Sequence, residues 1–105
     1  MVITTVPDRE TAECLVTGIL ENRLAACIQI ADTRSFFLWE GKMQKENEVA
    51  LHIKTTEVCY ENLEHYIKKC HPYRVPEIIK IPIIGGFPGY LDWIYSVSGT
   101  PHSSE

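Results

Sequence analysis

The sequence has no excess of positive charge, no long apolar run and no paired-cysteine motif. Its ten Lys and Arg residues are outnumbered by fourteen Asp and Glu residues, which gives a formal net charge of −4. Without a basic stripe that could follow a phosphate backbone, nucleic acid is not expected as a partner. No apolar run approaches the ~20 residues of a membrane-spanning helix, and the first residues lack the basic-then-apolar order of a signal peptide. These absences predict a cytoplasmic protein that does not contact a membrane.

Cysteine pairs, internal repeats and glycine-rich phosphate loops are also missing. The four cysteines form no CxxC pair, and without a secretion signal they are expected to be reduced thiols. A chain of 105 residues is long enough for one modest core, and at this size contacts between subunits often add burial. We therefore predict a single domain over residues 1–98, followed by a flexible tail over residues 99–105.

The spacing of apolar residues predicts secondary structure in the order β-α-β-β-α-β-α. The second strand is expected to break or bulge near Asp32, and Glu40-Gly41 has the composition of a tight hairpin. Asp8 is predicted to cap the first helix, and Thr55-Thr56-Glu57 the second. The elements are predicted over residues 1–6, 12–20, 26–39, 44–54, 59–70, 78–84 and 91–95.

Right-handed crossovers turn this order into an α+β fold of the ferredoxin-like, split βαβ type, with the first two helices on one face of the sheet. The short third helix is an addition at the C-terminus. Because this fold hosts many activities, function has to be argued from particular residues.

The hairpin between Ala26 and Lys54 is unusually long. Each arm has about 14 residues, well above the usual five or six. Residues 36–39 place four large apolar side chains, Phe-Phe-Leu-Trp, beside the tip on both faces of the strand, where a monomer cannot easily bury them. We infer a homo-oligomer in which the hairpin packs on neighbouring subunits.

The stretch from Cys70 to Ile79 holds the densest set of side chains able to bind a metal or a small anion. Cys70 and His71 offer a thiolate and an imidazole, which suit Cu(I), Cu(II) or Zn(II), although two ligands leave a site incomplete. Cys70 also completes the apolar stripe of the second helix and could be buried there, and His71 could instead cap the last carbonyls of that helix. Cys14 and Cys59 are predicted to be structural.

A second group of residues suits a cleft between subunits because it combines cations, a phenol, a carboxylate, an indole and a thiol. Glu77 is a possible base or metal ligand, but it could equally pair with Lys54 or Arg74 at the surface. No nucleophile and base are recognisable together, so we do not expect an enzyme. The predicted cleft residues are Cys27, Trp39, Lys54, Tyr73, Arg74 and Glu77.

Six segments spread over nearly the whole chain resemble the CutA divalent-cation tolerance family. They are Thr5-Val6-Pro7-Asp8, Leu24-Ala25-Ala26-Cys27-Ile28, Trp39-Glu40-Gly41-Lys42, Ile53-Lys54-Thr55-Thr56, the stretch His71-Pro72-Tyr73 with Val75-Pro76-Glu77-Ile78, and Tyr90-Leu91-Asp92-Trp93-Ile94.

The resemblance implies a ferredoxin-like homotrimer, built through the long hairpin and linked to binding and tolerance of copper or another divalent metal such as zinc. No metal is expected to be required for folding. Some bacterial members have a metal-linked cysteine and two histidines at the positions of Thr4, Cys70 and His71, so only His71 matches in kind. The family also resembles PII-type signalling proteins. The alternative function is therefore a sensor that binds an anionic effector between subunits through Lys54 and Arg74.

Overall fold

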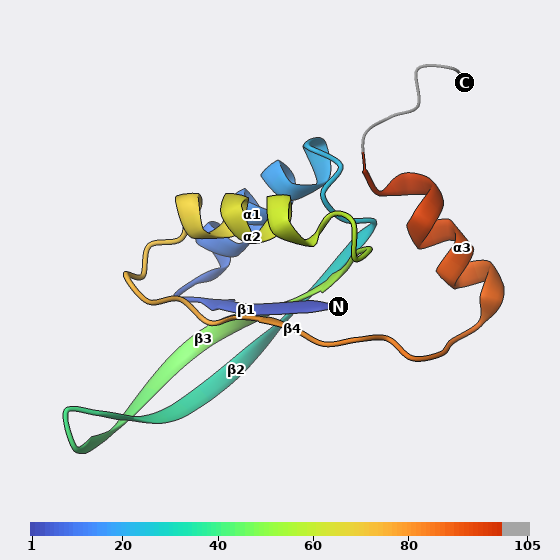
Figure 1. The fold of residues 1–105 in the computed structure, drawn as a ribbon. Helices are drawn as coiled ribbons and strands as arrows, with labels where there is room; N and C mark the ends of the chain where they lie inside the picture. Colours follow the sequence, from blue (N-terminus) through green and yellow to red (C-terminus); the bar gives the residue numbers. More distant parts are fainter. Residues whose placement is uncertain (100–105) are drawn as a thin grey trace.

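The computed structural model describes residues 1–99 and is built on one four-stranded antiparallel sheet (Figure 1). The strands lie side by side in the order β2-β3-β1-β4. This is the predicted α+β arrangement, and the predicted order of elements is confirmed. The elements are β1 (Val2–Val6), α1 (Arg9–Glu21), β2 (Cys27–Trp39), β3 (Lys42–Lys54), α2 (Tyr60–Cys70), β4 (Ile78–Lys80) and α3 (Pro88–Val97).

Helices α1 and α2 lie next to each other on one face of the sheet, as Figure 1 shows, and the core lies between them and the strands. Alternate residues of β3 point into it, as the predicted strand pattern requires, and the apolar stripes of both helices meet them. Asp8 caps α1 as predicted, since its Oδ1 accepts a hydrogen bond of 2.8 Å from the backbone N–H of Thr11. The core residues include Val49, Leu51, Ile53, Ala12, Leu15, Ile19, Leu63 and Ile67.

Strands β2 and β3 form a continuous ribbon, paired from Cys27 opposite Lys54 to Trp39 opposite Lys42. The break predicted near Asp32 is wrong, because Asp32 keeps its place in the ladder opposite Val49. Its carboxylate reaches outward to the guanidinium of Arg9 at 2.9 Å, so a polar residue is accommodated without a bulge. The two-residue turn is confirmed: Glu40 and Gly41 have φ of 53° and 79°, the left-handed values of a tight hairpin turn.

The ribbon extends well beyond the helical layer (Figure 1). The molecule measures 53 × 27 × 21 Å, and its radius of gyration is 14.9 Å. A compact chain of this length has a radius of gyration of about 13 Å. The outer half of the ribbon is therefore covered by none of the three helices found within residues 1–99.

The predicted end of β4 and the predicted cap of α2 are wrong. The strand predicted over 78–84 ends at Lys80; Ile81 still donates a backbone hydrogen bond of 2.7 Å to Met1, but Pro82 has no N–H with which to continue. Helix α2 begins at Tyr60 and is not capped by residues 55–57. The hydroxyl of Thr55 donates to the carbonyl of Leu24 at 2.6 Å instead, which ties the chain to the end of α1.

Helix α3 is longer than the predicted 91–95 and begins at Pro88. Pro88 occupies its first turn, where a missing N–H costs nothing. Figure 1 shows α3 beside the sheet rather than on the face covered by the first two helices. Among residues 1–99, no helix is both long and apolar enough to span a bilayer. Most of the predicted tail, residues 100–105, lies outside the described residues, so the domain boundary at residue 98 stays a prediction.

Candidate functional site

His71 is held inside the chain by hydrogen bonds at both ring nitrogens. Its Nδ1 accepts from the backbone N–H of Tyr73 at 3.1 Å, so the proton must be on Nε2, which lies 2.8 Å from the carbonyl oxygen of Thr5 and donates to it. The residue is 8% exposed. It fastens the loop after α2 to strand β1. A metal at His71 would therefore have to displace one of these two bonds.

Cys70 is the last residue of α2, and its thiol is free and exposed. The prediction that it could be a buried member of the helix stripe is wrong, because the stripe residues that reach the core are Leu63 and Ile67. Cys70 lines a groove between α1 and α2 that does not include His71. The two adjacent residues thus face different surroundings.

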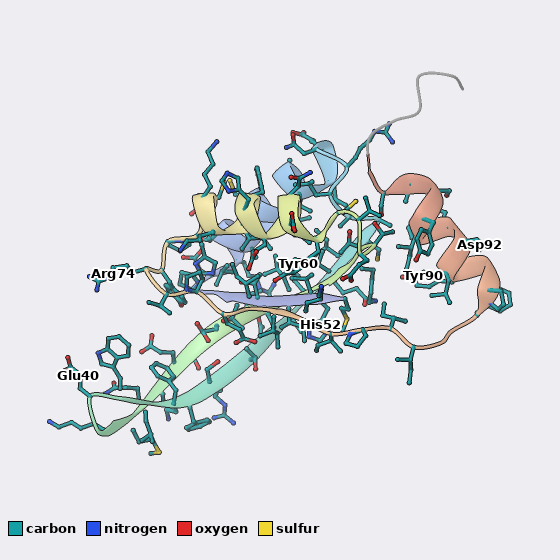
Figure 2. All side chains as sticks on the ribbon, viewed as in Figure 1. Glu40, His52, Tyr60, Arg74, Tyr90 and Asp92 are labelled. Carbon is teal, nitrogen blue, oxygen red and sulfur yellow. The ribbon has the colours of Figure 1, made fainter. Side chains whose placement is uncertain are left out.

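A second groove lies between the ribbon and the loop that follows α2; we call it the ribbon groove. Glu40 lies at the ribbon tip, and Figure 2 shows Arg74 at the same end of the molecule. The groove has a volume of about 480 Å³ and brings together three predicted cleft residues. Its lining is Phe37, Trp39, Glu46, Glu48, Tyr73, Arg74 and Val75.

Glu48 is the polar centre of the ribbon groove. One carboxylate oxygen accepts a hydrogen bond of 2.7 Å from the hydroxyl of Tyr73, and the other accepts one of 2.5 Å from Ser35. Burial, reinforced by the bond to Glu48 and by its charge, raises the pKa of Tyr73, so the phenol stays protonated and donates. The sequence alone did not point to Glu46 and Glu48, because a polar run at one end of a strand is also typical of a solvated surface. With two carboxylates against Arg74, the groove is acidic.

The other three predicted cleft residues do not line this groove. Lys54 is at the opposite end of the ribbon, where its ammonium group donates to Gln29 at 2.8 Å, and Cys27 lies across the ladder from it. The pKa of Tyr90 in α3 is raised, first by desolvation and then by the Cys27 thiol, which places Cys27 beside α3. Glu77 is exposed on the loop before β4.

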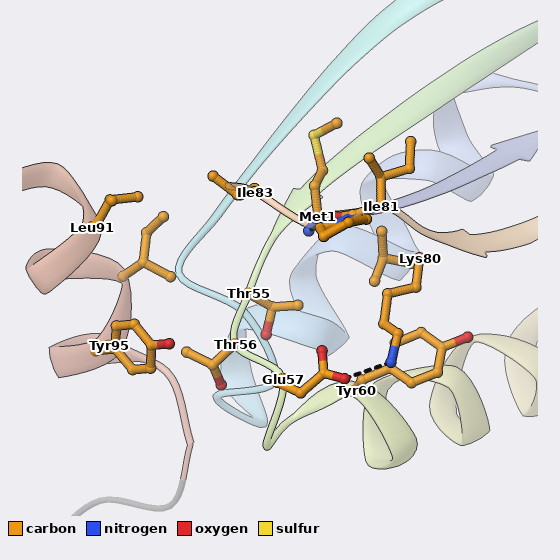
Figure 3. A pocket seen from close by; sticks show the side chains of 13 residues that line it. Met1, Thr55, Thr56, Glu57, Tyr60, Lys80, Ile81, Ile83, Leu91 and Tyr95 are labelled. Atoms are coloured by element: carbon orange, nitrogen blue, oxygen red, sulfur yellow. Dashed lines mark hydrogen bonds and ion pairs between the residues drawn. The ribbon is translucent and has the colours of Figure 1, made fainter. Parts of the chain in front are cut away.

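A further pocket, which the sequence did not indicate, lies between α3, β4 and the start of β1 (Figure 3). Its charged wall is an ion pair of 2.6 Å between Lys80 and Glu57, with the ammonium nitrogen 4.6 Å from the ring centroid of Tyr60. The hydrogen bond to Glu57 raises the pKa of Lys80. Lys80 therefore already has a carboxylate and an aromatic partner in this pocket, which has a volume of about 260 Å³.

A closed site for a divalent cation is not assembled by the described part of one chain. Among residues 1–99, no three His, Cys, Asp or Glu side chains are grouped so that they could hold a metal ion. His71 has both nitrogens occupied, and Cys70 offers one thiol. A divalent ion such as Zn(II) takes three or four protein ligands. Residues 1–99 of a single chain therefore do not fit such an ion.

The sequence matches a family model described as CutA1 divalent ion tolerance protein over residues 1–97. The divalent-cation tolerance protein CutA of Pyrococcus horikoshii is 43% identical over 94 residues, which cover 90% of this chain and 92% of that protein.

Solved structures agree with this match. The crystal structure of CutA1 from Oryza sativa is similar with a TM-score of 0.91 and 39% identity, covering 95% of this chain and 93% of that chain. The structure described as the periplasmic divalent cation tolerance protein CutA from Archaeoglobus fulgidus has a TM-score of 0.89 and 38% identity, covering 91% and 94%.

Proposed function

The chain belongs to the CutA1 divalent ion tolerance protein family, and on this premise we propose that it is a homotrimer that binds divalent cations, copper among them. The observation that carries the proposal is the match over residues 1–97. The family is named for tolerance and not for a reaction, and we propose no catalysed step. A cytoplasmic location stays a prediction, since one similar structure is described as periplasmic.

The uncovered ribbon tip supports the homotrimer. Leu38 is 77% exposed and Met43 72% exposed, and Phe36 and Trp39 beside them are each 59% exposed. Patches of this kind are rarely left in water by a monomer. Strand β2 is also an edge strand of thirteen residues whose outer backbone groups are open to another strand. Neighbouring copies would cover both features.

For the cation, we propose Cys70 and His71 as ligands, with the remaining ligands supplied by another copy or by water. Cys70 is accessible without any change in the chain. His71 can join only by giving up its bond to the Thr5 carbonyl or to the Tyr73 N–H, which costs about 0.5–1.5 kcal/mol of net stability for each bond lost. The acidic ribbon groove, with Glu46 and Glu48, also favours a cation over an anion.

Mass measurement and metal titration test the proposal. Light scattering after gel filtration should give about 36 kDa, three copies of the 12.0-kDa chain. Calorimetric titration with Cu(II) should show binding that weakens in Cys70→Ser and in His71→Asn. A monomeric mass would contradict the homotrimer, and unchanged Cu(II) binding in both variants would remove these two ligands.

The ribbon groove gives the sensor alternative one supporting observation, because Trp39, Tyr73 and Arg74 gather there as an effector pocket would require. Lys54 lies elsewhere, and the two carboxylates oppose an anionic effector. Titration of the metal-free protein with a nucleotide panel separates the two functions. Tight nucleotide binding that is lost in Arg74→Ala would favour the sensor.

A further inference from the structure

Helices α1 and α2 approach closely at one point, where Gly18 of α1 faces Tyr66 of α2. A Cβ at Gly18 would lie 1.7 Å from the hydroxyl oxygen of Tyr66, so only a glycine lets the phenol rest against α1. Cys14 lies one helical turn before Gly18, and Cys70 lies one turn after Tyr66. This arrangement brings one cysteine of each helix to the same side of the contact.

Both cysteines line one groove of about 320 Å³, which we call the helix groove. Both are free and exposed. Tyr66 lines the same groove, and its hydroxyl rests against α1 at Gly18, one helical turn from Cys14. Cys14, which is predicted to be structural, is exposed and faces the groove rather than the core. The lining consists of Glu10, Thr11, Cys14, Leu15, Tyr66 and Cys70.

We propose that Cys14 and Cys70 form a dithiol site for a soft monovalent cation of the Cu(I) type. Thiolates select such cations over hard ones, and Cu(I) is satisfied by two sulfur ligands. The helix groove supplies the two thiols, one from each helix, without any ligand from another copy. Zn(II), by contrast, needs more ligands than this groove holds.

Binding releases protons and transfers no electrons. One Cu(I) and two thiols give a copper bis-thiolate with one net negative charge, and two protons pass to solvent. Lys68 and Lys69, in the last turn of α2, lie next to Cys70 in the sequence and offset that negative charge, while Glu10 in the lining opposes it.

This site goes beyond the proposed divalent site and does not depend on it. The two sites share Cys70, but the dithiol site uses Cys14 in place of His71. It also takes a cation of different charge and lies within one chain. The two proposals can therefore fail separately.

The test is an anaerobic competition for Cu(I) between the reduced full-length protein and a coloured chelator such as bicinchoninate. The native protein should bind one Cu(I) per chain. Cys14→Ser and Cys70→Ser should each weaken binding more than ~100-fold, since loss of a direct ligand exceeds the 10–100-fold effect of losing an outer-shell partner. Cys27→Ser is the matched control, because Cys27 lies at the start of β2 outside this groove, and its affinity should equal that of the native protein.

Other outcomes would overturn the dithiol site. Native-like Cu(I) affinity in Cys14→Ser would show that Cys14 is not a ligand. If, in addition, His71→Asn abolishes Cu(I) binding, the site proposed for the divalent cation takes the Cu(I) instead. One Cu(I) per three chains would place the metal between copies. If Cys14→Ser fails to fold by circular dichroism, X-ray absorption of the native copper complex decides, because two sulfur ligands alone support the site and a nitrogen ligand refutes it.

Discussion

Replacing His71 by Ala should destabilise the protein strongly, even though the residue lies in a loop. The change removes the hydrogen bonds to the Thr5 carbonyl and from the Tyr73 N–H, as well as the packing of the imidazole on the Tyr73 ring at 4.9 Å between centroids. Each bond contributes about 0.5–1.5 kcal/mol, and a buried group left unpaired costs about 1–3 kcal/mol. The expected loss in the free energy of unfolding is therefore about 2–4 kcal/mol.

Two conservative variants divide this effect between the two ring nitrogens. The Asn side chain in His71→Asn can accept from the Tyr73 N–H as Nδ1 does, whereas the longer Gln in His71→Gln can donate to the Thr5 carbonyl as Nε2 does. Each should lose about half as much stability as the Ala variant. Urea unfolding, followed by circular dichroism at one fixed protein concentration, measures all four proteins; the concentration has to be fixed because assembly adds to apparent stability.

An Ala variant within ~0.5 kcal/mol of the native protein, the range of ordinary surface substitutions, would contradict this expectation. In that case the imidazole would not hold the loop to β1, and its two nitrogens would be free to serve a metal. Equal losses in the Asn, Gln and Ala variants would instead show that ring packing, and not hydrogen bonding, carries the effect.

Three further predictions follow from packing, charge and exposure. The pKa of Tyr73 is raised above its ordinary value of 10.0, so the stability that this shift contributes is complete below about pH 10 and is lost as the pH rises from there through the raised pKa. Tyr73→Phe should therefore flatten the alkaline fall in the free energy of unfolding relative to the native protein. Gly18→Ala should lower the urea midpoint, because overpacking against Tyr66 costs ~1–3 kcal/mol and outweighs the ~1 kcal/mol gain in helix propensity. The double variant that also carries Tyr66→Leu should recover part of this loss. Leu38→Glu at the ribbon tip should reduce the mass seen by light scattering, whereas Val58→Glu, at a position 89% exposed in the turn before α2, should leave it unchanged; equal masses for both variants would show that the tip is not an interface.

The sequence by itself determined the order of the elements and the layers of the fold. Strand alternation and helical stripes each lie within one continuous segment, and each follows from burial of one apolar face of that segment. Examples are the alternation of Val49, Leu51 and Ile53 and the stripe through Leu15 and Ile19. The turn at 40–41 was equally readable, because left-handed backbone angles favour particular residues. Element ends were less readable where a distant partner intervened, as when Thr55 bonds to Leu24 and does not cap α2.

Only the tertiary structure decided which side chains act together. Cys70 and His71 are adjacent in the sequence, yet one lines the helix groove and the other is fixed to β1. Tyr73 and Glu48, 25 positions apart, share a hydrogen bond. Cys14 meets the groove of Cys70 because Gly18 lets the two helices approach. Periodicity says which way a residue faces, but strand register and helix packing decide what it faces, and both are set by contacts between segments distant in the chain.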